Sequence, residues 1–178
     1  NTVELDGVRA TLIKRQDGSL NIDDLLVRDD TDPTPRQVAI SGVKIDNGEL
    51  TWLDEASGRR ITITDFQLSS GAIVADTGGE RYQAQTLHAS ARGQAEAATF
   101  DLSLDLARLM LSAGQAQGEA LQVTAKLAEP TRQLTAQLTI PSIEGNQGVV
   151  TLDNLAGDLT LASPKLPMKS LKLPIQGQ

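Results

Sequence analysis

Apolar and polar residues alternate along most of this chain, which is the two-residue period of a half-buried β-strand. The clearest example is residues 37–73, where two apolar stripes flank a turn sequence at residues 55–58. The first stripe slips in phase at residues 46–48, because apolar residues fall on odd positions before that point and on even positions after it. A hairpin turn or a β-bulge would produce such a slip. We favour the bulge, because a hairpin at this point would have short arms.

Similar stripes occupy the rest of the chain. Residues 2–14 alternate with a slip at residues 6–7, and residues 82–92 have the pattern of a weaker strand of small residues. Turns are predicted at residues 93–97 and 113–118, where glycine and other small residues cluster. Pro141 is predicted to end the strand that precedes it, because proline cannot donate a hydrogen bond to a neighbouring strand.

Three successive stripes in the C-terminal half carry most of the large apolar residues. Antiparallel neighbours joined by short turns keep such residues on one side of a sheet, so the stripes are predicted to form one continuous apolar surface. Its candidate members are Phe100, Leu102, Leu104, Leu106, Leu121, Val123, Leu127, Leu134, Leu138 and Ile140. Two interpretations fit this surface: a closed core under a second layer, or an open groove that holds lipid acyl chains. The alternation alone favours the ordinary core, because a sandwich produces the same pattern.

The strands implied by these stripes are about 10–14 residues long and would span roughly 33–45 Å, whereas typical strands have about 5–6 residues. The sequence therefore predicts one mainly β domain over residues 1–178. Its expected form is a long-stranded, curved antiparallel meander sheet with one short N-terminal helical turn at residues 22–26, capped by Asn21. Phase slips near Asp46, Arg108 and Asn154 mark candidate bulges that would curve the sheet.

Composition excludes several classes of function. The net charge of −7 argues against nucleic-acid binding, which needs clustered Lys and Arg, and four aromatic residues are too few for base-stacking platforms. The absence of Cys excludes disulfides and thiolate metal sites. No apolar run reaches the roughly 18 residues of a transmembrane helix. The chain begins with Asn1 in a segment that already has a strand pattern, so we expect it to be a fragment of a longer protein.

The sequence contains no recognisable constellation of catalytic residues. His88 is the only histidine, and it lies in mid-strand without an evident partner base or further metal ligands. Asp54 and Glu55 are adjacent, so in a strand their side chains would point to opposite faces and could not flank one bond as a carboxylate pair. We interpret both as turn residues. We therefore expect no enzymatic activity and no cofactor.

Two further charged groups are interpreted as solvated. The first is Asp29, Asp30 and Asp32. It lacks the ordered ligand spacing, the glycine and the final Glu of a calcium loop, so we expect no metal site. The second is Lys165, Lys169 and Lys172. These lysines could meet lipid head groups, but three charges fit a solvated strand face better.

Four short sequences in the first 75 residues form a recognisable set. They are Asp17-Gly18, residues 21–26 (NIDDLL), residues 43–54 (VKIDNGELTWLD) and residues 63–68 (ITDFQL). This set resembles the AsmA family of Gram-negative envelope proteins, whose pattern is similar to DG-x-x-N-I-x-D-L-L followed by V-x-I-x-N-G-x-L-x-W/Y-x-D. The specific match covers about a third of the chain. The Leu-rich strands of residues 76–178 are similar in style only.

The resemblance implies a large parent protein with an N-terminal anchor in the inner membrane and a periplasmic body. It also implies a curved sheet that forms a hydrophobic groove for lipid acyl chains or phospholipid, similar to bridge-like lipid-transfer proteins. The implied role is lipid transport and outer-membrane biogenesis, with outer-membrane assembly factors as partners and no catalytic motif. The alternative is a rigid structural or docking module for outer-membrane protein assembly. Such a module would have a closed core, no lipid, and edge strands that recruit a partner by strand addition.

Overall fold

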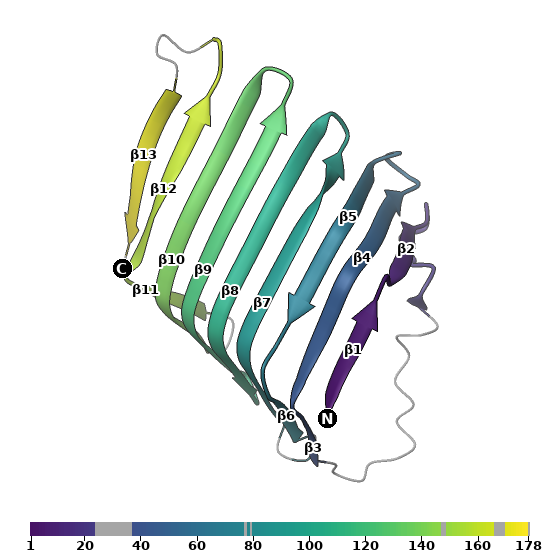
Figure 1. Ribbon diagram of the computed structural model, residues 1–178, viewed down its shortest axis with the longest axis vertical. Helices are drawn as coiled ribbons and strands as arrows, with labels where there is room; N and C mark the ends of the chain where they lie inside the picture. The colour runs from purple at the N-terminus through teal and green to yellow at the C-terminus, as the bar shows by residue number, and fades with distance from the viewer. Residues whose placement is uncertain (24–36, 77, 79, 147–148, 166–169, 178) are drawn as a thin grey trace.

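The fold is one extended β-sheet. The computed structural model describes residues 1–23, 37–76, 78, 80–146, 149–165 and 170–177, and in these residues thirteen strands join one sheet that is not closed (Figure 1). The strands are β1 (Thr2–Asp6), β2 (Arg9–Lys14), β3 (Gln37–Ile40), β4 (Gly42–Asp54), β5 (Arg60–Ser69), β6 (Ile73–Asp76), β7 (Arg81–Ala95), β8 (Ala98–Ser112), β9 (Gln115–Glu129), β10 (Arg132–Asn146), β11 (Val149–Asp153), β12 (Leu155–Ala162) and β13 (Ser170–Gly177). The main path is β1-β4-β5-β7-β8-β9-β10-β12-β13. The predicted mainly β, long-stranded sheet is confirmed.

Four central strands, β7 to β10, form the most regular part of the sheet. Each has 15 residues, longer than expected, and pairs antiparallel with the next. Two residues separate consecutive strands, so the turns are tight and fix the register. The longer turns predicted at residues 93–97 and 113–118 are therefore wrong. Gly93 and Gly118 lie inside strands. The Phe100 ring occupies the space that a Cβ on Gly93 would fill.

The N-terminal edge departs from the antiparallel meander. β1 and β2 both pair with β4 in parallel, and parallel strands need a crossover connection of a dozen or more residues. Residues 15–36 supply that length between β2 and β3. Asn21 ties this connection to β2, because its side-chain oxygen accepts the Ile13 N–H at 2.7 Å and its amide donates to the Thr11 carbonyl at 2.9 Å.

The predicted helical turn is a minor feature. The Asn21 side chain bonds to β2, and most of the helical turn that it was predicted to cap lies outside the described residues. Ile22 lies in a turn and Asp23 is helical, while residues 24–26 lie outside the described residues. The Asp23 carboxylate accepts the Leu20 N–H at 2.8 Å, which stabilises the turn.

The long strands change phase together along one line across the sheet, which we call the crease. It passes through Thr86, Ala107, Ala120, Pro141 and Asn154, on β7 to β10 and between β11 and β12. Thr86, Ala120 and Asn154 have positive φ angles of 49°, 53° and 52°. The pairing register is the same on both sides of this line. Figure 1 shows the lower ends of β7 to β10 turning away from their upper halves at this level.

The phase slips predicted at residues 46–48 and near Arg108 lie within continuous strands, whereas the slip near Asn154 falls between β11 and β12. At residues 46–48, β4 continues through a register shift, so the bulge interpretation is confirmed. Asn47 there has a φ of 53°, and its amide donates to Asp6 Oδ1 at 2.8 Å. The slips predicted near Arg108 and Asn154 lie on the crease. Pro141 does not end its strand, because β10 continues to Asn146 and a bulge position does not need the N–H that proline lacks.

The described residues contain no second layer over the sheet. Among hydrophobic side chains in the described residues only Leu106 and Ile140 are buried, at 8% and 6% exposure, and both lie next to the crease. The protein exposes 12333 Å², whereas a compact monomer of 18.9 kDa would expose about 8,300 Å². The sheet therefore has about half as much surface again as a compact protein of its mass.

Glycine at position 120 should stabilise the protein. A residue with a Cβ in the left-handed region costs roughly 1–2 kcal/mol, whereas glycine within a strand costs about 0.5–1 kcal/mol in conformational entropy. Ala120→Gly should therefore raise the midpoint of urea unfolding slightly. The matched control is Ala136→Gly in β10, which should lower it by the equivalent of about 0.5–1 kcal/mol. A midpoint for Ala120→Gly below that of the wild type would show that the crease is unstrained at this residue.

Candidate functional site

The ten predicted surface residues lie on one face of the sheet. Residues directly opposite each other in paired strands share a face. The register places Leu104 opposite Val123 and Val123 opposite Leu138, and it places Phe100 opposite Leu127. The two-residue period then carries the other members to the same face, namely Leu102, Leu106, Leu121, Leu134 and Ile140. We use the name apolar face for this surface together with the apolar residues of other strands that point to the same side of the sheet.

The apolar face extends beyond the three strands that the sequence analysis identified. Its members on β12 and β13 are Leu159, Leu161, Leu171, Leu173 and Ile175. Its members on β4 and β5 are Leu50, Trp52, Ile63, Phe66 and Leu68. The sequence analysis missed these residues as part of the site. The same alternation would have found them, but the prediction stopped at the three stripes with the most regular pattern.

Large side chains of the apolar face lean over glycines of the neighbouring strand. A Cβ on Gly93 would lie 2.6 Å from Phe100 Cζ, and a Cβ on Gly157 would lie 2.8 Å from Leu138 Cδ2. Real Cβ atoms do not come so close, so each glycine leaves room that its neighbour's side chain occupies. The apolar face is thereby continuous across the strands that carry these glycines.

The apolar face is open except along the crease. Leu102, Leu127 and Leu173 are 42%, 37% and 45% exposed, while Leu106 and Ile140 beside the crease are buried. Side chains on the inside of a bend are covered by neighbours from both sides of it. The burial pattern therefore places the apolar face on the inside of the bend.

The opposite face carries charged side chains in cross-strand ion pairs. Arg92 lies 3.4 Å from carboxylate oxygens of both Asp65 and Asp101, and Lys172 lies 3.1 Å from Asp158. These residues alternate with the apolar residues along each strand, so they point away from the apolar face. Exposed pairs of this kind contribute roughly 0–1 kcal/mol each. They identify the solvated side of the sheet more than they stabilise it.

His88 has an acidic neighbour that the sequence analysis did not identify. Its Nδ1 lies 2.6 Å from Asp105 Oδ1, because the tight turn between β7 and β8 brings the two residues directly opposite each other. Ser69 is opposite His88 on the other side. A nucleophilic triad would also need a hydrogen bond between serine and histidine, and donors for an oxyanion. The His88–Asp105 pair is about half exposed on the charged face, and we assign it no reaction.

Asp54 was predicted as a turn residue, but it is the last residue of β4, and its carboxylate accepts hydrogen bonds from the turn that follows. Its Oδ1 accepts the N–H groups of Ala56 at 3.0 Å and Ser57 at 3.2 Å, and Lys14 Nζ lies 3.5 Å from its Oδ2. The hydrogen bond from the Ser57 N–H is the largest cause of a lowered pKa for Asp54, with smaller contributions from Ala56 and Lys14. Glu55 follows in the same exposed turn.

The remaining charged candidates do not form a site in the described part of the chain. Asp29, Asp30, Asp32 and Lys169 lie outside the described residues, and Lys165 is exposed. Among the residues that are described, no group of three or more His, Cys, Asp or Glu side chains could hold a metal ion. No helix in this part of the chain is long and apolar enough to cross a membrane.

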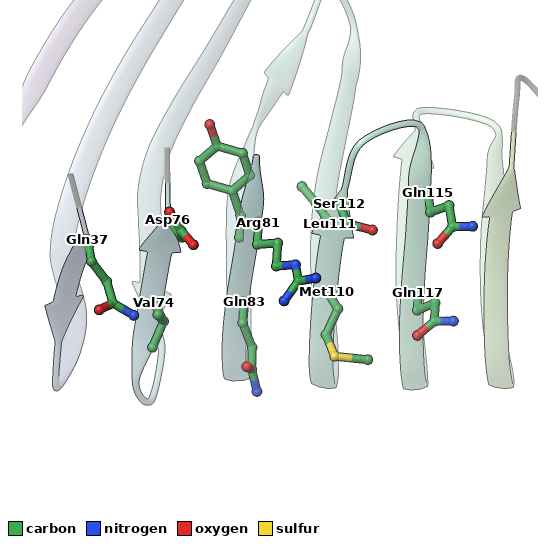
Figure 2. Close-up of a pocket in the computed structure, with 11 residues that line it drawn as sticks. Gln37, Val74, Asp76, Arg81, Gln83, Met110, Leu111, Ser112, Gln115 and Gln117 are labelled. Carbon is green, nitrogen blue, oxygen red and sulfur yellow. The ribbon is translucent and has the colours of Figure 1, made fainter. Parts of the chain in front are cut away.

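A polar hollow lies beyond the crease, on the charged side of the sheet. It has a volume of ≈ 490 Å³, and Figure 2 shows Arg81, Gln83 and Gln117 along it. Gln83 and Gln117 both pair with Met110, so they share its face. Amide and guanidinium groups suit hydrogen-bonding ligands and do not suit acyl chains. Leu111 of the apolar face also lines the hollow, so the two are not wholly separate, and we assign the hollow no ligand.

Comparison of the chain with protein-family models, with curated proteins and with solved structures gives no match in any of the three. The residues that carry the AsmA-like pattern have structural roles here. Asn47 forms the β4 bulge, and Asn21 holds the first connection to β2. Gly48 lies against the Phe66 ring, so that a Cβ on Gly48 would lie 3.2 Å from Phe66 Cδ1.

Acid should remove the contribution of Asp54 to stability. A carboxylate with a lowered folded-state pKa stabilises the protein above its unfolded pKa, about 3.9, and that contribution is lost as the pH falls through the folded value. Between about pH 5 and about pH 3, the wild type should therefore lose more stability than Asp54→Asn, which cannot titrate at that position. Urea unfolding at the two pH values measures the difference. Equal losses in the two proteins would contradict the assignment.

Proposed function

We propose that the apolar face holds lipid acyl chains and that the chain is a non-enzymatic part of an AsmA-like envelope protein. The observation that carries this proposal is the open apolar face, which runs from β4 to β13 with no second layer among the described residues. Monomeric proteins rarely expose apolar patches larger than a few hundred Å² unless the patch binds something. A lipid surface or a set of acyl chains is apolar and extended, so it could bury a face of this kind.

The chemistry of the face favours flexible apolar chains over a specific ligand. Its members are almost all aliphatic, and it contains few of the polar groups that orient small molecules in binding sites. Charged side chains lie on the opposite face, where Arg92 and Lys172 have acidic partners. An acyl chain needs only apolar contact along its length, and parallel rows of Leu and Val side chains supply it.

The periplasmic location, the inner-membrane anchor of the parent protein and the link to outer-membrane assembly factors come from the sequence resemblance. In this proposal the residues of the AsmA-like pattern shape the N-terminal part of the groove. They lie on β4, on β5 and at the start of the connection after β2. Lipid transport in support of outer-membrane biogenesis would follow from placing such a groove between the two membranes.

The alternative is a docking module for outer-membrane protein assembly. A closed core would require a second layer from outside the described residues, because these residues form a single sheet. Edge strands are its favourable feature, since β13 and β1 end the main path and, among the described residues, leave outer edges that a partner strand could join. Lipid bound to the purified protein distinguishes the two proposals.

A charge at Leu104 tests the lipid proposal. Leu104 lies in the middle of the apolar face, and an aspartate there would place an unpaired carboxylate against an acyl chain at a cost of several kcal/mol. Native mass spectrometry should show lipid on the wild-type protein and at least about tenfold less on Leu104→Asp, since about 1.4 kcal/mol corresponds to tenfold. The matched control is Ser103→Asp, which adds the same charge on the opposite face and should keep the lipid.

Circular dichroism must show that both variants are folded. If the wild type carries no lipid under any purification, or if Ser103→Asp loses lipid as completely as Leu104→Asp, the lipid proposal is wrong. Loss of folding in Leu104→Asp together with lipid-free wild type would favour the docking module, whose core would be covered by protein.

A further inference from the structure

Part of the apolar face is large enough to be a protein interface. The upper panel is the part on β5, β7, β8, β9, β10 and β12 that lies between the crease and the turns at residues 96–97 and 130–131. Six strands about 4.8 Å apart and nine residues at about 3.3 Å each cover roughly 850 Å². Stable protein–protein interfaces bury about 800 Å² from each partner. The upper panel therefore meets the requirement for a stable dimer by itself.

We propose that, when no lipid covers it, the upper panel closes on the same panel of a second copy of this chain. The product would be an isologous dimer in which two sheets pack face to face about 10 Å apart, as in a β-sandwich. A second copy fits the surface area, because the chain exposes about half as much surface again as a compact protein of its mass. Dimerisation through the upper panel would cover roughly a fifth of this excess on each copy. The proposal goes beyond lipid binding and does not depend on it.

The charge distribution allows the panel to face itself. An isologous contact brings identical groups close together, so a charge near its centre would repel its own copy. At the rim of the panel, Glu129 and Arg132 neutralise each other through hydrogen bonds of 2.6 and 2.9 Å. The charged rows with Arg92 and Asp101 lie on the other face. In the dimer these charged rows would stay in water on the two outer surfaces, so the charges of the two acidic chains would not face each other.

The bend at the crease determines how the two copies are oriented. The apolar face lies on the inside of the bend, so the part beyond the crease projects toward the partner. Two copies with their creased ends together would collide there. The two-fold axis must therefore run across the strands, with the creased ends at opposite ends of the dimer. Ala125 is the middle residue of β9 in the panel and lies near this axis, so it should approach its own copy.

A single cysteine tests this geometry, because the chain has no cysteine of its own. Ala125→Cys protein, refolded from urea without lipid, should form a covalent dimer with a short bismaleimide linker. The matched control is Thr124→Cys, which is one residue away but points to the opposite face, and it should stay uncrosslinked. Sedimentation equilibrium of lipid-free wild type should give twice the monomer mass of 18.9 kDa. Oleoyl lysophosphatidylcholine should dissociate the dimer and prevent the crosslink at position 125.

Three results would overturn the proposal: a monomeric mass at every soluble concentration, equal crosslinking at positions 124 and 125, or polymers larger than a dimer. A protein that carries lipid after purification and stays monomeric once that lipid is removed would overturn the dimer and support the lipid proposal. A lipid-sensitive dimer in a protein that never carries lipid from the cell would support the dimer and count against the lipid proposal. Leu102→Asp provides a second variant, and it should be folded by circular dichroism and monomeric by sedimentation.

Discussion

Burial of apolar surface is the dominant favourable term in folding, and a single sheet layer leaves that burial incomplete. Ordinary domains cover the apolar face of a sheet with a second sheet or with helices. In the described residues Leu106 and Ile140 alone reach the burial of core side chains, and they do so only because the sheet bends beside them. The open face, the bend toward it and the placement of charges on the other face all follow from this constraint.

The crease shows how a long sheet can bend and still keep its apolar residues on one face and its charged residues on the other. A shift of one residue would carry every later side chain of a strand to the opposite face. Here Thr86, Ala120 and Asn154 each adopt a left-handed conformation at the same level of the sheet, and the strands between them change phase in step. The sequence matches this geometry, because the apolar residues of β8 move from even positions up to Leu106 to odd positions from Leu109 onward. Backbone strain at a few residues thus preserves one continuous apolar face over both parts of the sheet.

Local pattern was enough to predict the strands, their phase slips and the shared face of residues such as Leu104 and Leu138. It failed where a neighbour in space decides the structure. Gly93 has the local signature of a turn residue, yet it lies in a strand because the Phe100 ring occupies the space beside it. The His88–Asp105 pair depends on the register of a hairpin, which no local pattern displays. The presence or absence of a second layer was also unpredictable, because a covered face and an open face have the same two-residue period.

Any occupant of the apolar face would contribute to the stability of the protein. Covering a fully exposed leucine is worth roughly 1.5–3 kcal/mol, and the leucines of this face are already about half covered by their neighbours. Even so, the free energy gained by covering several of these residues would be comparable to the roughly 5–15 kcal/mol that separates typical folded and unfolded states. A lipid or a second copy that binds only the folded sheet shifts the folding equilibrium by mass action. Because both need the same side chains, such as Leu102 and Val123, each would exclude the other, and the amount of available lipid would set which form of the protein is present.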